Sequence, residues 1–136
     1  MCLSGDVREL EDWQWKVVDE AIRCYEQCAP IIRSGRNYRQ GPRVTDYNHP
    51  AGWQAVCRVN RGRGQILAVF HSFYDSKTET KIRLPAWEGE AWEIREAFHR
   101  NGITERLEEN SLTVEGVQNF DAAVWLLQKK TGKTEK

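Results

Sequence analysis

Hydrophobic positions between Leu10 and Arg33 repeat with the period of an α-helix. One stripe contains Leu10, Trp13, Val17, Ala21, Cys24 and Cys28, and the next contains Val18, Ile22, Tyr25, Ala29 and Ile32. Together the stripes form a wide apolar face, so we expect a large body to cover this helix. Asp6 is a suitable N-terminal cap and Gly35 a suitable stop, whereas Pro30 predicts a kink or a restart near Ala29.

From Gly52 onward the hydrophobic pattern changes to a period of two, which is typical of β-strands. We expect strands at Trp53–Val59, Gln65–Phe73, Glu79–Leu84, Ala91–Phe98, Ser111–Val114 and Ala122–Gln128. Turn-forming residues separate them, as in the segment Asn60–Gly64 and the pair Asn101-Gly102. The stretch from Arg36 to Pro50 is rich in Arg, Tyr, Gly and Pro, which predicts an extended crossing segment with little regular structure.

These elements predict a mainly β protein. The expected fold is an antiparallel β-sandwich of Greek-key type with about six to eight strands, preceded by one long N-terminal α-helix. The predicted organisation is a barrel-type helix with its entry turn at residues 1–35, an extended linker at 36–52, a C-terminal sandwich at 53–130 and a polar tail at 131–136. A chain of 136 residues is long enough for one domain with a proper core.

Composition adds constraints on the class of protein. Lys plus Arg is 20 and Asp plus Glu is 20, so the net charge indicates no particular partner. No run approaches the roughly 18 consecutive apolar residues that a membrane span needs, and no secretory signal follows Met1. The four cysteines are therefore expected to be reduced thiols of a cytoplasmic protein that does not enter a membrane.

Candidate metal and nucleophilic groups do not form a complete set. Cys24 and Cys28 lie about one helical turn apart, but structural zinc needs four ligands and no further cysteine or histidine is suitably spaced. Packing in the core is the favoured interpretation of both thiols. His49, His71 and His99 are isolated, and no Ser-His-Asp or Cys-His arrangement can be recognised. We expect no metal, no cofactor and no catalytic residue.

Two binding interpretations remain open beside these. The six tryptophans include Trp53, Trp87 and Trp92, which are candidates for a sugar-stacking platform, although burial in the core is favoured for them. Such a platform would make the chain a stand-alone carbohydrate-binding module. The arginine-rich segment Arg33–Arg63, with Tyr38 and Tyr47 inside it, is the candidate surface of a nucleic-acid-binding domain that contacts phosphates and stacks on bases.

Four motifs follow one another in a distinctive order. They are Leu3-Ser4-Gly5-Asp6, the helical Trp15 to Tyr25, Ile31-Ile32-Arg33-Ser34-Gly35 and Gly52-Trp53-Gln54-Ala55-Val56-Cys57-Arg58. This order resembles the C-terminal part of the melibiase-type α-galactosidases, in which a (β/α)₈ barrel is followed by an antiparallel β-sandwich. The resemblance runs from Leu3 to about Lys129 and implies that the long helix is the last helix of such a barrel.

The resemblance implies a supporting domain and no enzyme in the chain alone. The family's catalytic pair consists of two aspartates on earlier barrel strands, and no position here matches either one. Asp6 matches only an aspartate at the rim of the active site. A barrel needs about 250 residues, so it cannot fit in this chain. The implied partner is the catalytic barrel of a parent retaining glycoside hydrolase, with homo-oligomers and saccharides as further partners.

Overall fold

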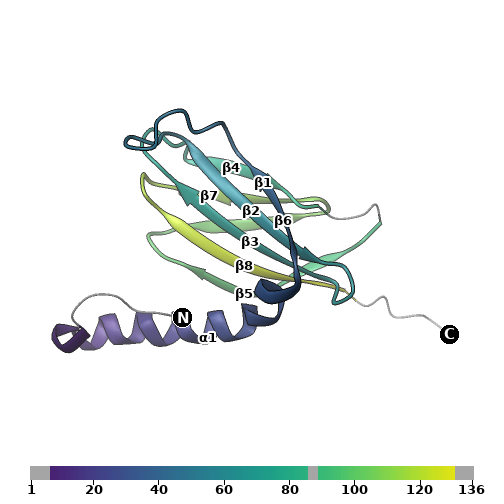
Figure 1. Ribbon diagram of the computed structural model, residues 1–136, viewed down its shortest axis with the longest axis horizontal. Coiled ribbons are helices and arrows are strands. Elements are labelled where there is room, and N and C mark those ends of the chain that lie inside the picture. Colours follow the sequence, from purple (N-terminus) through teal and green to yellow (C-terminus); the bar gives the residue numbers. More distant parts are fainter. Residues whose placement is uncertain (1–6, 86–88, 131–136) are drawn as a thin grey trace.

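A long helix crosses the outer face of a two-layer β-sandwich (Figure 1). The computed structural model describes residues 7–85 and 89–130. Within these ranges the chain forms a short 3₁₀ helix at Val7–Glu9, the helix α1 at Asp12–Ser34 and eight strands. The strands are β1 (Arg36–Gln40), β2 (Trp53–Asn60), β3 (Gln65–Ser72), β4 (Glu79–Arg83), β5 (Trp92–His99), β6 (Thr104–Glu108), β7 (Ser111–Glu115) and β8 (Ala122–Lys129).

The strands form two antiparallel sheets. The larger sheet has the order β1-β2-β3-β8-β5, and the smaller has the order β4-β7-β6. The chain crosses between the sheets after β3, β4, β5 and β7, so strands that are neighbours in sequence often belong to different layers. This arrangement confirms the predicted fold class, an antiparallel sandwich that follows one long helix.

Alternate residues of the strands fill the space between the two sheets. In β2 the inward side chains are Ala55, Cys57 and Val59, all of them buried. The same core contains Ile66, Ala68, Phe70, Ile82, Leu112, Val114, Trp125 and Leu127, together with several smaller contributors. This alternation explains the period of two in the sequence, because one face of each sheet turns toward the core.

The two central strands of the larger sheet are apolar on both faces because α1 covers the outer one. Leu67 of β3 and Leu126 of β8 point outward and pack with Cys24, Cys28 and Ile31 of α1. These five side chains form a second cluster, separate from the core between the sheets. No helix in the described ranges is both long enough and apolar enough to span a membrane.

The N-terminal end of α1 is capped by a residue that the sequence pattern did not indicate. The predicted cap, Asp6, lies outside the described residues. Glu11 precedes the helix, and its backbone N–H donates to Oε1 of Gln14 at 2.8 Å. The side chain of Glu11 also accepts a hydrogen bond of 2.7 Å from the indole of Trp13. These bonds satisfy polar groups that the first turn would otherwise leave without a partner.

The C-terminal end of α1 confirms the predicted stop at Gly35 and excludes a restart of the helix at Pro30. Gly35 stops the helix, as expected. Arg58 passes so close that a Cβ at this position would lie 2.5 Å from its Cγ, so only glycine fits without a shift. The helix continues through Pro30 to Ser34, so it does not restart near Ala29, and a kink, the other outcome expected from Pro30, stays a prediction. The helix tolerates the proline because burial of its apolar stripe outweighs one lost backbone hydrogen bond.

Two strands lie where none was predicted. β1 occupies the first five residues of the segment that was expected to have little regular structure, and it pairs with β2 in the register Tyr38↔Cys57. β6 pairs with β7 in the register Leu107↔Leu112. Both are edge strands, since each pairs along one side only. The predicted linker at residues 36–52 therefore begins inside the larger sheet.

Candidate functional site

A row of apolar side chains that are not buried lies along α1. Cys24, Cys28 and Ile31 face the sheet, whereas a second stripe points about a third of a turn away from them. That stripe consists of Trp15, Val18, Ile22, Tyr25, Ala29 and Ile32. None of its members is buried, and Trp15 alone exposes 40% of its surface. We call these six residues the outer stripe.

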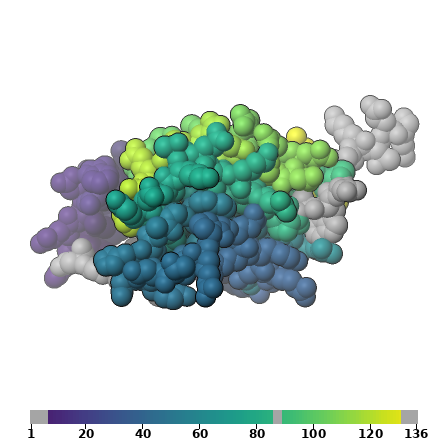
Figure 2. Space-filling view, turned by 90° about the horizontal axis from the view of Figure 1, so that it is seen from above, coloured from purple at the N-terminus to yellow at the C-terminus, as the bar shows by residue number. Residues whose placement is uncertain are grey.

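The first turns of α1 extend past the edge of the sandwich. Trp13 belongs to the same stripe as Cys24 and Cys28, yet it is 60% exposed, which agrees with the projection of the first turns of α1 beyond the strands (Figure 1). Figure 2 shows the same N-terminal part of the helix projecting from the body of the molecule. The buried contacts begin only at Cys24, so the N-terminal half of α1 is fixed by few contacts with the sheets.

Polar contacts fix the position of the other half of α1. The guanidinium of Arg58 donates from Nε to the carbonyl of Ile31 at 2.9 Å and from Nη1 to Oδ1 of Asn37 at 2.9 Å. Asn60 donates to the hydroxyl of Ser34 at 2.7 Å. These contacts join the end of the helix to β2 and set which stripe faces the sheet and which faces solvent.

The helical cysteines are buried, as the favoured interpretation predicts. Burial is the main cause that raises the pKa of Cys28 to about 12 and also raises the pKa of Cys24. Cys57 lies in the core between the sheets, where burial raises its pKa to about 12. Such thiols are poor nucleophiles because little thiolate forms. Nowhere in the described ranges do three or more His, Cys, Asp or Glu residues gather in a way that could hold a metal ion.

The three tryptophans named as a sugar platform are not brought together where they are described. Trp53 is half-buried at the start of β2, and its ring centroid lies 6.2 Å from that of Phe70. Trp92 is 5% exposed and pairs with Lys129 at the opposite end of the larger sheet. Trp87 lies outside the described residues, as does the rim candidate Asp6. Trp53 and Trp92 thus contribute to packing, and they do not share a flat exposed face.

The histidines occupy separate parts of the fold. His71 is exposed on β3, and His49 is exposed in the connection between β1 and β2. His99 lies with Nε2 at 2.9 Å from a carboxylate oxygen of Glu105 and beside the ring of Trp125. Each histidine has different surroundings, so the three do not lie together.

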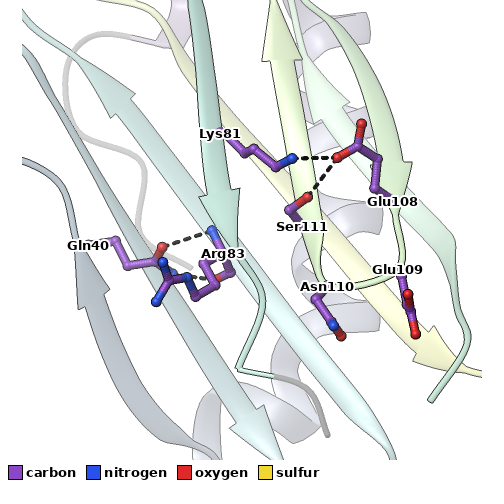
Figure 3. A pocket seen from close by; sticks show the side chains of 7 residues that line it. All are labelled: Gln40, Lys81, Arg83, Glu108, Glu109, Asn110 and Ser111. Atoms are coloured by element: carbon purple, nitrogen blue, oxygen red, sulfur yellow. Dashed lines mark hydrogen bonds and ion pairs between the residues drawn. The ribbon is translucent and has the colours of Figure 1, made fainter. Parts of the chain in front are cut away.

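A broad polar pocket of about 830 Å³ opens between β1 and the smaller sheet (Figure 3). Lys81 donates to Glu108 at 2.7 Å, and the hydroxyl of Ser111 donates to the same oxygen at 3.0 Å. The hydrogen bond from Lys81 is the main cause that lowers the pKa of Glu108. A carboxylate held in its ionised form is a poor proton donor near neutral pH, so Glu108 is poorly suited to act as a general acid.

On the opposite side of this pocket, the side chain of Gln40 joins the two sheets. Gln40 of β1 accepts a hydrogen bond of 2.8 Å from the backbone N–H of Arg83 in β4, and its amide nitrogen donates back to the Arg83 carbonyl (Figure 3). One side chain thereby satisfies both backbone groups of a residue in the facing layer. Its role is to join the edge of the larger sheet to the smaller sheet.

The arginines of the segment Arg33–Arg63 point in several directions. Arg36 and Arg39 lie three residues apart on β1 and so project from opposite faces of the sheet. Arg58 is committed to the end of α1. Six members are exposed, namely Arg33, Arg36, Arg39, Arg43, Arg61 and Arg63. The segment is basic, but β1 divides it into two surfaces instead of one continuous track.

Comparisons with protein-family models, curated proteins and solved structures found no match. The observations that bear on function are therefore the outer stripe of α1 and the motif order of the sequence. Spacing signals most of this stripe, because Val18, Ile22 and Tyr25 lie three or four residues apart. The initial pattern omitted Trp15, although it lies three residues before Val18 and extends the stripe by one turn.

Proposed function

We propose that the chain is the non-catalytic C-terminal β-sandwich of an α-galactosidase-like glycoside hydrolase, in which it supports the catalytic (β/α)₈ barrel. The observation that carries the proposal is the outer stripe of α1. This helix buries part of one stripe on the sandwich, and in the second stripe no residue is buried and Trp15, Tyr25 and Ile32 are exposed. A helix with two such stripes suits a position between two bodies, and large exposed apolar surfaces commonly mark interaction sites.

The motif order of the sequence supports a (β/α)₈ barrel as the second body. In the melibiase-type enzymes the last barrel helix leads directly into the sandwich, as α1 leads into β1 and β2 here. The bonds from Arg58 and Asn60 hold the end of α1 on the sandwich and leave the outer stripe free for the barrel. Support of the barrel, with no hydrolysis by the chain itself, is the function that this geometry favours.

A complementation experiment tests the proposal. A melibiase-type α-galactosidase truncated before its last barrel helix would be co-expressed with the full chain. We expect the two to co-purify and to hydrolyse an α-galactoside that the chain alone leaves intact. Trp15→Glu and Tyr25→Glu each place a charge in the proposed interface, so each should weaken association at least about tenfold.

Tyr47→Glu provides the matched control, because Tyr47 is an exposed aromatic residue outside α1. This variant should associate with the barrel as well as the natural chain does. Equal association by all three variants, or hydrolysis by the purified chain alone, would contradict the proposal. Concentration-dependent dimers that Trp15→Glu abolishes, without any barrel binding, would instead assign the outer stripe to a second copy of the chain.

A further inference from the structure

A smaller pocket, of about 390 Å³, opens at the end of the sandwich where β3 stops and β8 begins. It is lined by Asn48, His49, Pro50, Tyr74 and Phe120. These residues come from three connections, β1 to β2, β3 to β4 and β7 to β8, which meet at this end of the larger sheet. We propose that this aromatic pocket binds one pyranose ring of a neutral saccharide.

Two aromatic residues of the pocket are largely exposed to solvent. Tyr74 is 65% exposed and Phe120 is 70% exposed. Exposed rings that face one small cavity offer apolar area without any folding benefit. The C–H faces of a pyranose are a natural complement, because they are apolar while the ring edge carries hydroxyl groups.

The backbone at Phe120 is unfavourable for a side chain of this size. Its φ is 62°, in the left-handed region that bulky residues rarely adopt. Glycine would occupy this position at lower energy, and the exposed ring returns little burial in compensation. Strain of this kind persists where the surroundings hold it, and it is concentrated at functional sites. The strained backbone therefore supports a role of the Phe120 ring in ligand binding.

A hydrogen-bonded frame holds Phe120 in place. The next residue, Asp121, is buried and accepts from the backbone N–H of Gln118 at 2.8 Å and from the side chain of Asn101 at 2.8 Å. The backbone N–H of Asp121 donates to the hydroxyl of Ser72 at 2.8 Å, and the N–H of Ser72 donates to the Asp121 carbonyl at 2.9 Å. The turn that carries the ring is therefore tied to the end of β3.

The other sides of the pocket are fixed in the same way. Asp46 accepts hydrogen bonds from the backbone N–H groups of Asn48 at 2.9 Å and His49 at 3.2 Å. Gly52 donates to the carbonyl of Tyr74 at 2.9 Å, which joins two of the three connections. A pocket that is held in shape before binding loses less entropy when a ligand enters.

The polar groups of the pocket favour a neutral hydroxylated ligand. None of its five lining residues is Asp, Glu, Lys or Arg, so the lining itself offers no countercharge to an ionic ligand. The amide of Asn48 and the imidazole of His49 both donate and accept hydrogen bonds, as sugar hydroxyls do. Apolar area with a few such groups is the usual composition of a small-molecule site.

This inference is independent of the proposed association with a barrel. α1 contributes no residue to the pocket, and the outer stripe contributes none either. A chain that binds saccharide without binding a barrel, or the reverse, would separate the two proposals experimentally.

The test is an amide NMR titration of the full ¹⁵N-labelled chain with galactose, glucose, mannose and a short α-galacto-oligosaccharide. We expect saturable shifts at millimolar sugar that cluster on Asn48, His49, Tyr74 and Phe120. Phe120→Gly removes the ring and relieves the backbone, so it should abolish the shifts while the melting temperature stays the same or rises. Tyr74→Ala should weaken binding at least about tenfold.

Tyr38→Ala is the control, since it removes a partly exposed tyrosine from β1 and should leave the affinity unchanged. Absence of saturable shifts with every sugar would overturn the inference. So would shifts that Phe120→Gly leaves intact, or shifts that cluster elsewhere on the molecule. A dispersed spectrum for each variant verifies that a loss of binding does not come from unfolding.

Discussion

At the scale of single residues, Cys57 links stability to pH. Its folded pKa is raised from 9.0 to about 12 by burial, so the unfolded thiol ionises first as the pH rises. Its contribution is fully present below pH 9.0 and is lost as the pH rises toward about 12. The natural chain should have a larger free energy of unfolding than Cys57→Ala below pH 9.0. We expect this difference to shrink as the pH rises, by at most about 1.4 kcal/mol per pH unit.

Urea unfolding of both proteins at a series of alkaline pH values measures this difference. Other groups that titrate in this range act on both proteins alike and cancel in the comparison. At neutral pH the variant should be the less stable of the two, because it leaves a small cavity in the core. A difference in the free energy of unfolding that stays constant up to the highest pH would contradict the assignment.

Residue-scale prediction from the sequence succeeds for the cysteines and misses the aromatic pocket. Cys24 and Cys28 fall on an apolar helical stripe, so their spacing predicts one shared face, and both are buried where that face packs on Leu67 and Leu126. Tyr74 and Phe120 lie in different turns and meet only because β3 and β8 are paired. No local pattern could place the two rings beside each other, since that pairing is a long-range feature of the fold.

At the scale of elements, Arg58 determines how firmly α1 is held. Arg58→Ala removes the donors to Ile31 and Asn37 and the aliphatic contact with Gly35. We expect the free energy of unfolding to fall by about 1–2 kcal/mol. Amide hydrogen exchange should show the largest loss of protection in the last turns of α1, with β7 nearly unchanged.

Arg39→Ala is the matched control, an exposed arginine on β1, and should change stability by less than about 0.5 kcal/mol. Uniform loss of protection across both sheets in Arg58→Ala would show instead that α1 cannot detach by itself. The same loss of stability in both variants would assign the effect to net charge.

Sequence patterns predict elements well where both sides of a strand are buried and poorly at the edges of sheets. β3 and β8 show nearly continuous apolar runs because the core covers one face and α1 the other. β1 and β6 contain one large apolar side chain each, Tyr38 and Leu107, among polar residues. Both edge strands form because a neighbouring strand offers backbone partners, and their own composition does not signal this.

At the scale of the whole molecule, the two apolar clusters share the same strands. Trp125 and Leu127 of β8 point into the core between the sheets, whereas Leu126 between them points toward α1. Disrupting the packing of either cluster therefore shifts strands that also carry the other cluster. We expect one cooperative urea transition, with far-UV and near-UV circular dichroism giving the same midpoint within error. Two separated midpoints would show that α1 and the sandwich unfold independently.

The order of strands has a consequence for synthesis of the protein. β8 is the last of the described strands in sequence, yet it lies between β3 and β5 in the larger sheet. While the ribosome is still adding residues before Ala122, β3 has an open edge and β5 lacks a partner in its sheet. The nascent chain must therefore keep two unpaired edges from joining other chains until β8 emerges. Chaperones that shield such edges would act late, when nearly the whole sandwich has already been made.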